Sequence, residues 1–271
     1  MPELPEVETT RRGIAPALLE RRVLEAIVRD RRLRWPIQAD FESAVKNQTV
    51  RKVGRRAKYL TIEFDAGTLI LHLGMSGSLR MLREGVPPEP HDHWDLRLDS
   101  GWLLRFHDPR RFGSLHWTAE DPAQHRLLKK LAPEPLSDQF DGDYLFRATR
   151  KRSVAIKQLI MNSQLVVGVG NIYASEALFR ARISPRRAAR RISRAEAQKL
   201  ARAIKAVLSA AIKIGGTTLR DYVNADGAPG YFRQKLFVYE RAGSACRRCK
   251  SPIRQFTQGQ RSTYWCSTCQ R

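Results

Sequence analysis

The chain has 271 residues, a length that favours two domains, and its 42% hydrophobic and 28% charged residues exclude disorder as the main state. It carries 49 Lys and Arg against 27 Asp and Glu, a formal net charge of +22. Residues 1–145 hold 23 cations and 22 anions, whereas residues 146–271 hold 26 cations and 5 anions. We therefore expect a near-neutral scaffold joined to a domain that binds a polyanion, with a merely cationic, soluble surface as the alternative.

Arginine supplies 37 of the 49 cations, and its planar guanidinium group bonds phosphate oxygens in pairs and stacks on bases. Nucleic acid is therefore a better candidate partner than a membrane surface. No apolar run approaches the ~18–20 residues that a spanning helix needs. The acidic start, residues 1–6, has no apolar signal core, so we expect a cytoplasmic protein.

The N-terminal half predicts one helix followed by strands. Pro5 suits the first turn of a helix over residues 5–19, and Pro16 is expected to kink or shorten it. The apolar residues of this helix recur at helical spacing, at Val7, Ile14 and Leu18. Short β-rich runs separated by Asp and Gly turns then occupy residues 59–64, 68–73, 93–98 and 102–106. We expect a β-sandwich with the first helix packed against it.

The C-terminal half is predicted to be mainly helical. Residues 132–150 begin with a stretch rich in Pro and acidic residues, and we interpret them as a connector. Ser193 and Glu196 then have the spacing of a capping box before an apolar helical face, which Gly215-Gly216 ends. Residues 217–231 lack periodicity and predict a long loop of a kind that is often functional.

All four cysteines lie in the last 26 residues, as two Cys-x2-Cys knuckles separated by 16 residues. Each knuckle lets two thiolates converge on one ion, which predicts one Zn²⁺ bound by Cys246, Cys249, Cys266 and Cys269. A pair of disulfides is the alternative, and a reducing cytosol disfavours it. Four protein ligands leave no position for water, so we expect a structural site.

Two glycines, Gly168 and Gly170, precede a predicted helix over residues 173–180. Such a turn exposes backbone N–H groups that favour a phosphate, although it is also a common helix connector. It lacks the third glycine of a dinucleotide-binding fingerprint. In a basic domain that ends in a zinc ribbon, nucleic-acid phosphate is the favoured ligand.

Six motifs together resemble the bacterial formamidopyrimidine-DNA glycosylase family, which repairs 8-oxoguanine. They are the four-cysteine ribbon, Pro-Glu-Leu-Pro-Glu-Val-Glu-Thr at 2–9, Asp-Pro-Arg-Arg-Phe-Gly at 108–113, Pro-Glu-Pro-Leu-Ser-Asp at 133–138, Gly-Val-Gly-Asn-Ile-Tyr-Ala-Ser-Glu at 168–176 and Gly-Gly-Thr-Thr-Leu at 215–219. Their order and spacing match over nearly the whole chain. Leu4 stands where the related endonuclease VIII group has Gly, which favours the purine-specific branch.

The resemblance implies an α+β multidomain fold. Its parts would be an N-terminal catalytic β-sandwich with flanking helices (1–131), the connector (132–150), a helix–two-turn–helix domain (151–238) with a lesion loop at 217–231, and a zinc-ribbon finger (239–271). It also implies a monomeric base-excision repair enzyme with glycosylase and lyase activities. Such an enzyme flips an oxidised purine out of duplex DNA, preferably opposite cytosine, and cleaves the strand by β,δ-elimination.

Pro2 is the candidate nucleophile. A small second residue permits removal of the initiator Met1, which leaves Pro2 with a secondary amine that is partly deprotonated at neutral pH. That amine can attack a sugar carbon and give a cationic iminium, an electron sink that acidifies the neighbouring sugar proton for elimination. Taken alone, Pro2 is better explained as the start of a helix, and the resemblance reverses that preference in favour of the nucleophile.

The resemblance implies three further catalytic residues. Glu3 would move protons to and from the opening sugar, and Lys58 would contact phosphate and assist elimination. Arg261, between the two cysteine knuckles, would assist the second elimination. Without the resemblance, Glu3 is a carboxylate favoured by a helix N-terminus and Lys58 is a solvated charge. Glu6 has the same ambiguity as Glu3, and we expect it to have a supporting role.

The resemblance also implies DNA contacts that are individually uninformative. Met75 and Phe112, which would otherwise be core residues, lie in Gly-flanked segments and offer apolar bulk that can wedge between bases. Lys157 would lie near the extruded lesion. The residues expected to touch the backbone or the opposing base are His91, Arg110, Arg152, Asn171 and Tyr239.

Two other functions stay open at this point. An endonuclease VIII-like glycosylase would act on oxidised pyrimidines, which assays on paired lesion duplexes would distinguish. A non-catalytic zinc-ribbon protein would bind DNA without ever forming a covalent adduct.

Overall fold

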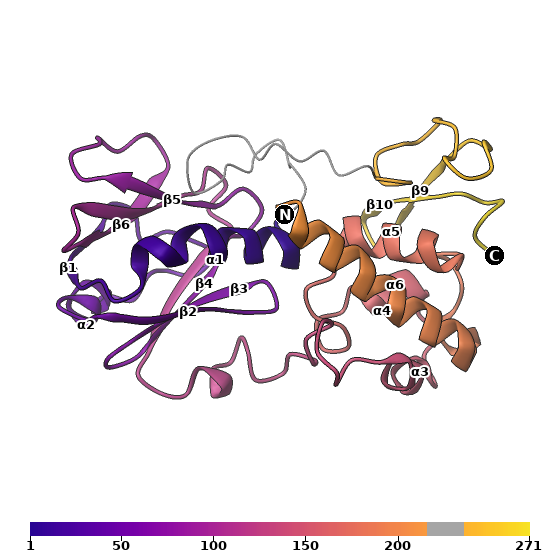
Figure 1. The fold of residues 1–271 in the computed structure, drawn as a ribbon, viewed down its shortest axis with the longest axis horizontal. Helices are drawn as coiled ribbons and strands as arrows, with labels where there is room; N and C mark the ends of the chain where they lie inside the picture. The colour runs from indigo at the N-terminus through magenta and orange to yellow at the C-terminus, as the bar shows by residue number, and fades with distance from the viewer. Residues whose placement is uncertain (216–235) are drawn as a thin grey trace. The chain divides into compact units, whose positions relative to one another are not determined.

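The computed structural model describes residues 1–215 and 236–271, which fall into two compact units (Figure 1). The first unit comprises Met1–Lys129, and the second comprises Lys130–Ile214 with the described residues from 236 onward. The ribbon therefore shares a unit with the helices. The loop predicted over 217–231 lies outside the described residues. None of the helices described in either unit is long and apolar enough to cross a membrane.

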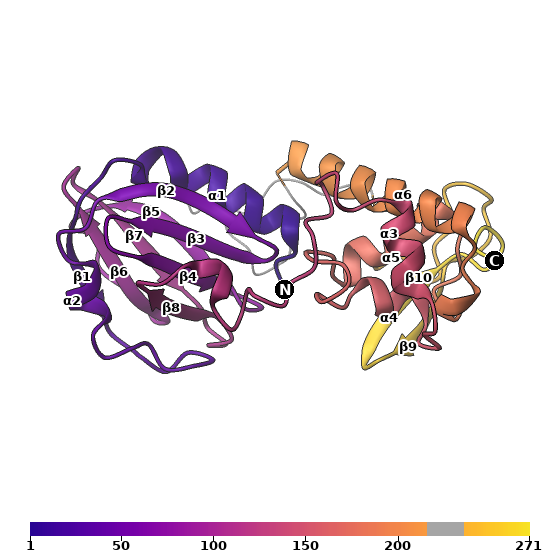
Figure 2. The same cartoon turned by 90° about the horizontal axis from the view of Figure 1, so that it is seen from below.

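The first unit is a sandwich of two four-stranded antiparallel sheets (Figure 2). The strand orders are β1-β6-β7-β5 and β2-β3-β4-β8. The strands are β1 (Val23–Val28), β2 (Val50–Arg56), β3 (Tyr59–Phe64), β4 (Thr68–His72), β5 (Ser78–Arg83), β6 (Asp92–Leu98), β7 (Trp102–His107) and β8 (Ser114–Thr118). Strands β3, β4, β6 and β7 confirm the four strands predicted from the sequence.

Helix α1 (Leu4–Leu18) packs on the sandwich, as predicted, with contacts to β2, β3 and β5 (Figure 2). Its buried Val7 joins a core that contains Leu60 and Trp94, one from each sheet. Pro16 lies exposed in the last turn, and the helix continues for two residues past it, so the expected kink or shortening stays a prediction. The other elements of this unit are α2 (Phe41–Val45) and the short 3-10 helix η1 (Pro122–Gln124).

The second unit contains α3 (Gly142–Thr149), α4 (Ile156–Ile160), α5 (Asn171–Ala181), the 3-10 helix η2 (Ala189–Arg191) and α6 (Arg194–Lys213). Helix α6 begins at the predicted capping box of Ser193 and Glu196. Helix α3 corrects our interpretation of residues 132–150, because it fills much of the expected connector. Asp141 caps α3 by accepting a hydrogen bond from the backbone of Tyr144 (2.6 Å), so this acid marks a helix N-terminus that packs on α6.

The ribbon is an antiparallel hairpin of β9 (Arg254–Gln258) and β10 (Arg261–Trp265). Gly259 and Gln260 connect the strands with φ of +54° and +59°. Two consecutive left-handed residues are the conformation of a tight type I′ hairpin turn. Strand β10 contacts α5, so the ribbon is packed on the helical part of its own unit.

Candidate active site and nucleic-acid interface

The chain enters α1 through a pair of buried carboxylates. The backbone N–H of Glu3 donates to Glu6 Oε2 (2.9 Å), and the Glu3 side chain accepts from the backbone of Glu6. Glu3 is 2% exposed and Glu6 is fully buried, and both lie at the positive end of the helix dipole. Pro2, also buried and bonded to Met1 here, directly precedes this capping box. We therefore expect Glu6 to support Pro2 by fixing the start of the helix beside it.

Lys58 lies in the tight turn between β2 and β3, where Ala57 has φ of +55°. Arg55 donates to the carbonyl oxygen of Ala57 (2.7 Å) and pairs with Glu8 of α1 (3.3 Å). Glu8 also pairs with Arg11 (2.8 Å). Burial alone would raise the pKa of Glu8, but hydrogen bonds and charge from the guanidinium groups around it lower that pKa to about 2. A permanent carboxylate therefore joins the helix that follows Pro2 to the turn that carries Lys58.

His72, at the end of β4, is a candidate site residue that the sequence analysis treated only as part of a strand. Burial, and then the positive charges of Lys58, Arg34 and the N-terminus, lower the pKa of His72 to about 4. The ring is therefore neutral at pH 7. The backbone N–H of Gly74 donates to its Nδ1 (2.9 Å), which leaves the hydrogen on Nε2 as a donor suited to a phosphate oxygen. A histidine two residues before the Gly-flanked segment 74–77 was the signal that could have identified it.

Met75, Arg110 and Phe112 lie on two loops that touch each other. A Cβ on Gly74 would come within 2.4 Å of the Phe112 carbonyl carbon, so the close approach requires glycine. Met75 is 36% and Phe112 45% exposed, which confirms that neither is a core residue. The Arg110 guanidinium lies 4.9 Å from the centre of the Phe112 ring, and among the described residues it forms no ion pair. Two exposed apolar side chains, Met75 and Phe112, thus lie with a cation, Arg110, that has no ion-pair partner among the described residues.

His91, Arg152 and Arg261 are exposed, as contacts to DNA need to be. His91 has φ of +75° just before β6, with its ring centre 6.0 Å from that of His107. Arg152 lies between α3 and α4, and Arg261 is the first residue of β10, beside the hairpin turn. The candidate catalytic residues Pro2, Glu3 and Lys58 therefore belong to the first unit and Arg261 to the second.

Lys157 is 1% exposed, and its expected place near the extruded lesion stays a prediction. Its ammonium donates to Asn171 Oδ1 (2.6 Å), Thr263 Oγ1 (2.7 Å) and the carbonyl oxygen of Ser262 (3.3 Å). Asn171 donates to the same carbonyl oxygen (2.9 Å). Lys157 of α4 and Asn171 of α5 therefore hold strand β10 in place at the residues that directly follow Arg261. The enclosed ammonium presents almost no surface to a base.

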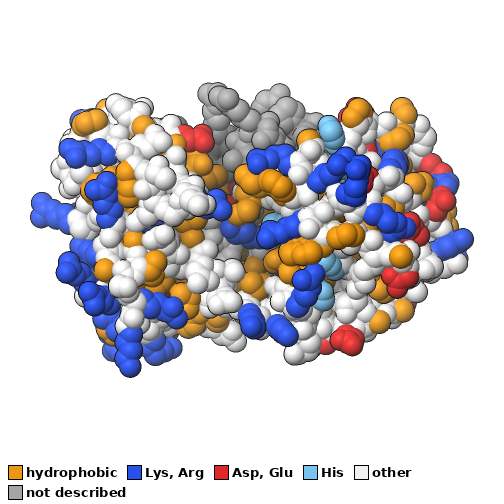
Figure 3. Space-filling view, turned by 180° about the vertical axis from the view of Figure 1, so that it is seen from behind, with side chains coloured by type: hydrophobic (Ala, Val, Ile, Leu, Met, Phe, Trp, Pro, Cys, Tyr) orange, Lys and Arg blue, Asp and Glu red, His pale blue; other side chains and the backbone are white. Residues whose placement is uncertain are grey.

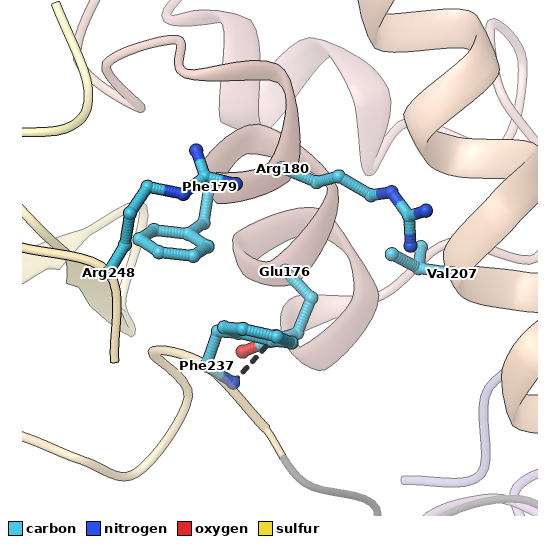
Figure 4. Close-up of a pocket in the computed structure, with 6 residues that line it drawn as sticks. All are labelled: Glu176, Phe179, Arg180, Val207, Phe237 and Arg248. Atoms are coloured by element: carbon cyan, nitrogen blue, oxygen red, sulfur yellow. Dashed lines mark hydrogen bonds between the residues drawn. The ribbon is translucent and has the colours of Figure 1, made fainter. Parts of the chain in front are cut away.

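Glu176 of α5 positions the segment that contains Tyr239. Its carboxylate accepts hydrogen bonds from the backbone N–H groups of Phe237 (2.8 Å), Val238 (2.9 Å) and Tyr239 (3.0 Å), the first of which is drawn in Figure 4. Burial raises the pKa of Glu176, while the three donors favour its charged form. The Tyr239 ring packs edge-on against Tyr264 of β10 at 5.2 Å. The sequence motif contains Glu176, but its three partners are more than 60 residues away along the chain.

A pocket of about 300 Å³ lies beside Glu176 (Figure 4). The rings of Phe179 and Phe237 are stacked there with centres 5.5 Å apart, and Arg248 lies 5.3 Å from the Phe179 ring. None of the site residues predicted from the sequence lines it. The pocket is therefore a feature of the ribbon's packing on α5 and α6.

The four cysteines form one cluster, with all Sγ atoms within 4.8 Å of one another. Cys246 and Cys269 are 4.0 Å apart and Cys249 and Cys266 are 3.4 Å apart between Sγ atoms. These separations are too long for disulfides, and they bracket the ~3.8 Å edge of a tetrahedron with Zn–S bonds of about 2.3 Å. The donor set is thus the all-thiolate set of a structural zinc site, as predicted.

These parts, a sandwich with a capped N-terminal proline helix and a helical unit bearing a four-cysteine ribbon, define a DNA glycosylase with a helix–two-turn–helix domain. Family models agree: the formamidopyrimidine-DNA glycosylase N-terminal domain matches residues 1–115, the formamidopyrimidine-DNA glycosylase H2TH domain matches 131–223, and the zinc finger found in FPG and IleRS matches 243–271. The chain belongs to the formamidopyrimidine-DNA glycosylase family.

Individual relatives are similar over their whole length. The formamidopyrimidine-DNA glycosylase of Thioalkalivibrio sulfidiphilus is 59% identical over 271 residues, which is all of both chains. The crystal structure of the MutM (Fpg) protein from Thermus thermophilus is 39% identical, with a TM-score of 0.89 over 99% of this chain and 98% of that one. A Lactococcus lactis Fpg variant in complex with DNA containing Fapy-dG is 31% identical, with a TM-score of 0.93 over all of both chains.

The exposure of Arg152, in the strongly basic half of the chain, leads to a prediction. Figure 3 shows many more Lys and Arg than acidic side chains on the face that it draws. If Arg152 contacts a phosphate, Arg152→Ala should reduce the slope of log affinity against log salt by about one unit, because one fewer counterion is released. The measurement is duplex binding over a salt series. Arg97→Ala is the matched control, since Arg97 pairs with Glu25 and Glu84. An Arg152 slope equal to that of wild type would place this residue off the DNA.

Proposed function

We propose that this protein excises oxidised purines, such as 8-oxoguanine and formamidopyrimidines, from duplex DNA and cleaves the strand through Pro2. The observation that carries the proposal is a proline directly after the initiator, held at a helix start by Glu3 and Glu6, in a chain of this family. The solved relative bound to DNA containing Fapy-dG supports the purine class of lesion.

The reaction starts with the removal of Met1 and the extrusion of the damaged nucleotide, which costs about a few kcal/mol of stacking and pairing. The Pro2 nitrogen then bonds to C1′ of the sugar, and the base leaves with a proton. Opening of the sugar ring breaks the C1′–O4′ bond and gives the iminium. Loss of the C2′ proton to a base then breaks the C3′–O bond and releases one phosphate end. Loss of the C4′ proton breaks the C5′–O bond and releases the other, and water hydrolyses the iminium to free Pro2.

Three residues have proposed roles along this path. Glu3, buried beside Pro2, supplies the proton that O4′ takes as the ring opens. Lys58 holds the phosphate next to the lesion, in the turn that Arg55 fixes. Arg261, on the ribbon hairpin, assists the second elimination. Zinc, bound by the four cysteines, would supply the folding energy of the ribbon and thereby hold the hairpin that carries Arg261.

Lys157 and Asn171 act one step further from the reaction. We infer that they are positioning residues, because their hydrogen bonds reach the two residues after Arg261. Tyr239, held by Glu176, and His91 are proposed backbone contacts. We further propose that the protein works as a monomer in the bacterial cytoplasm, on the DNA of the nucleoid.

The base opposite the lesion is read, in this proposal, by Arg110. Met75 and Phe112 fill the space that the extruded base leaves. Cytosine presents two acceptors, O2 and N3, to the guanidinium fork, whereas adenine presents one acceptor and a donor. A bidentate contact of this kind is worth roughly 1–3 kcal/mol, or about ten- to a hundredfold in preference for cytosine.

Arg110→Ala should therefore slow cleavage opposite cytosine far more than cleavage opposite adenine. Single-turnover rates on the two 8-oxoguanine duplexes measure the ratio. Arg111→Ala is the matched control, because the Arg111 guanidinium already pairs with Asp30 (2.9 Å). If the ratio of the cleavage rate opposite cytosine to that opposite adenine is unchanged in Arg110→Ala, Arg110 does not read the opposite base. It would then contact a phosphate or help Met75 and Phe112 to fill the space.

Three substrates test the proposed activity itself. Wild-type protein is assayed under single-turnover conditions on duplexes that carry 8-oxoguanine, an oxidised pyrimidine or no lesion, each with borohydride present. We expect the 8-oxoguanine duplex to be cleaved, and to give a trapped adduct, faster than the other two duplexes. Faster reaction on the pyrimidine would support the endonuclease VIII-like alternative, and binding without cleavage or adduct would support the non-catalytic one.

A further inference from the structure

We propose that Asp108 is a positioning residue that holds Met75, Arg110 and Phe112 as one rigid wedge. This inference rests on the proposed function, since it concerns how the wedge enters DNA. Asp108 is fully buried in the first unit, although its neighbour Arg110 is exposed. It belongs to no element, directly after β7, and it makes no direct contribution to the wedge surface.

The Asp108 carboxylate joins the two loops. Its Oδ1 accepts from the Ser76 hydroxyl (2.7 Å) and from the backbone N–H of Arg110 (3.3 Å), and its Oδ2 accepts from the backbone N–H of Gly113 (2.8 Å). Ser76 directly follows Met75, and Gly113 directly follows Phe112. One side chain therefore sets the position of one loop relative to the other.

The backbone of Asp108 connects a third segment. Its N–H donates to the carbonyl oxygen of His91 (3.0 Å), and its own carbonyl oxygen lies 2.8 Å from Nε2 of the buried His93. His91 is a proposed DNA contact. Three stretches that are far apart in the sequence, each carrying a proposed DNA contact, thus meet at one residue.

A carboxylate suits this position better than any other side chain. Three donors converge on it, and an ionised carboxyl group accepts on both oxygens, whereas an amide offers one acceptor and two donors. Because the site is buried, a donor left without an acceptor is costly. Gly113 approaches its neighbours closely, because a Cβ on it would lie 2.6 Å from the Phe106 ring and 3.1 Å from Asp108 Oδ2, so no side chain fits at this position.

The wedge side chains depend on this support because they have little of their own. Met75, Arg110 and Phe112 are all exposed, and the contact between Arg110 and Phe112 is itself at the surface. Preorganised groups insert without first losing conformational freedom. We infer that Asp108 supplies the preorganisation, so that the three side chains enter the duplex together.

The test separates insertion from chemistry. A duplex with a non-cleavable tetrahydrofuran site and 2-aminopurine as its neighbour reports unstacking by fluorescence after stopped-flow mixing. Asp108→Asn, which keeps the shape of the side chain but loses an acceptor, should slow the insertion phase about tenfold or more. Ser76→Ala, which removes one of the three bonds, should slow it less. Borohydride trapping on a single-stranded abasic oligonucleotide, where no wedge is needed, should stay within about twofold of wild type in both variants.

Val45→Ala is the matched control for lost stability. Val45 is fully buried in α2, in the same core but not in either loop. If Val45→Ala slows insertion as much as Asp108→Asn at similar melting temperature, or if Asp108→Asn inserts at the wild-type rate, the proposal is overturned. If Asp108→Asn does not fold, Ser76→Ala decides by the same comparison. Failure of wild-type trapping would instead reject the proposed function.

Discussion

Borohydride is expected to trap a covalent adduct between this protein and 8-oxoguanine DNA only when Met1 has been removed. With Met1 attached, the nitrogen of Pro2 is an amide, whose lone pair is delocalised and cannot attack C1′. Once Met1 is gone, the secondary amine forms an iminium that borohydride reduces to a stable amine. In the protein that retains Met1, trapping should therefore fall to background. This loss is far larger than any binding defect produces.

The experiment compares the processed protein with a form that has one bulky residue inserted between Met1 and Pro2, so that processing stops. Mass spectrometry identifies each N-terminus and the residue joined to DNA. Binding to a tetrahydrofuran duplex is the control, since it needs no nucleophile. If the extended form is trapped as fully as the processed protein, Pro2 is not the nucleophile, whichever residue is found joined to DNA.

Cys249→Ser is expected to release the zinc and unfold the ribbon. A structural zinc site of this type contributes apparent binding energy of about 10–16 kcal/mol, which is folding energy for the segment that it holds. The ribbon has little other core: its buried cluster consists of Phe179, Val238, Ile253 and the cysteines themselves. DNA affinity should fall about tenfold or more, because Arg261 and other ribbon cations lose their positions.

Zinc content by metal analysis and duplex affinity give the two readouts. The first unit should keep its folding transition, because the ribbon belongs to the second unit. Ser267→Ala is the matched control, since it lies in the second knuckle, between Cys266 and Cys269, but has no thiol. A Cys249→Ser protein that contains no zinc and yet cuts damaged DNA at the wild-type rate would show that Arg261 does not need the ribbon.

The elements with a clear local pattern, either a residue periodicity or a motif spacing, were predictable from the sequence. Short β-rich runs between turns that contain Asp and Gly predicted four of the strands, and the Ser193 capping box predicted the start of α6. The cysteine spacing predicted a cluster that the Sγ distances fit. Helix α3 was missed because Asp141 and its neighbours are common both in linkers and at helix N-termini, and only packing on α6 distinguishes the two.

The site was predictable where exposure follows from local chain geometry. The flanking glycines correctly indicated that Met75 and Phe112 are exposed. Lys157, in contrast, is buried by hydrogen bonds to residues more than 100 positions away, and no local pattern encodes such a partner. Asp108 was missed for the same reason, since its role arises from segments that only the folded sandwich brings together.

The Glu8 carboxylate, which Arg11 and Arg12 hold by hydrogen bonds and which also pairs with Arg55, keeps its charge when the first unit is exposed to mild acid. A carboxylate with a depressed pKa contributes stability that is fully present above its unfolded value, near 4.5, and is lost only as the pH falls toward about 2. The link between α1 and the Lys58 turn therefore persists throughout the mildly acidic range. A decline in the rate between neutral pH and about pH 5 is therefore not due to loss of this link, and protonation of the reacting groups, above all the Pro2 amine, is the expected cause.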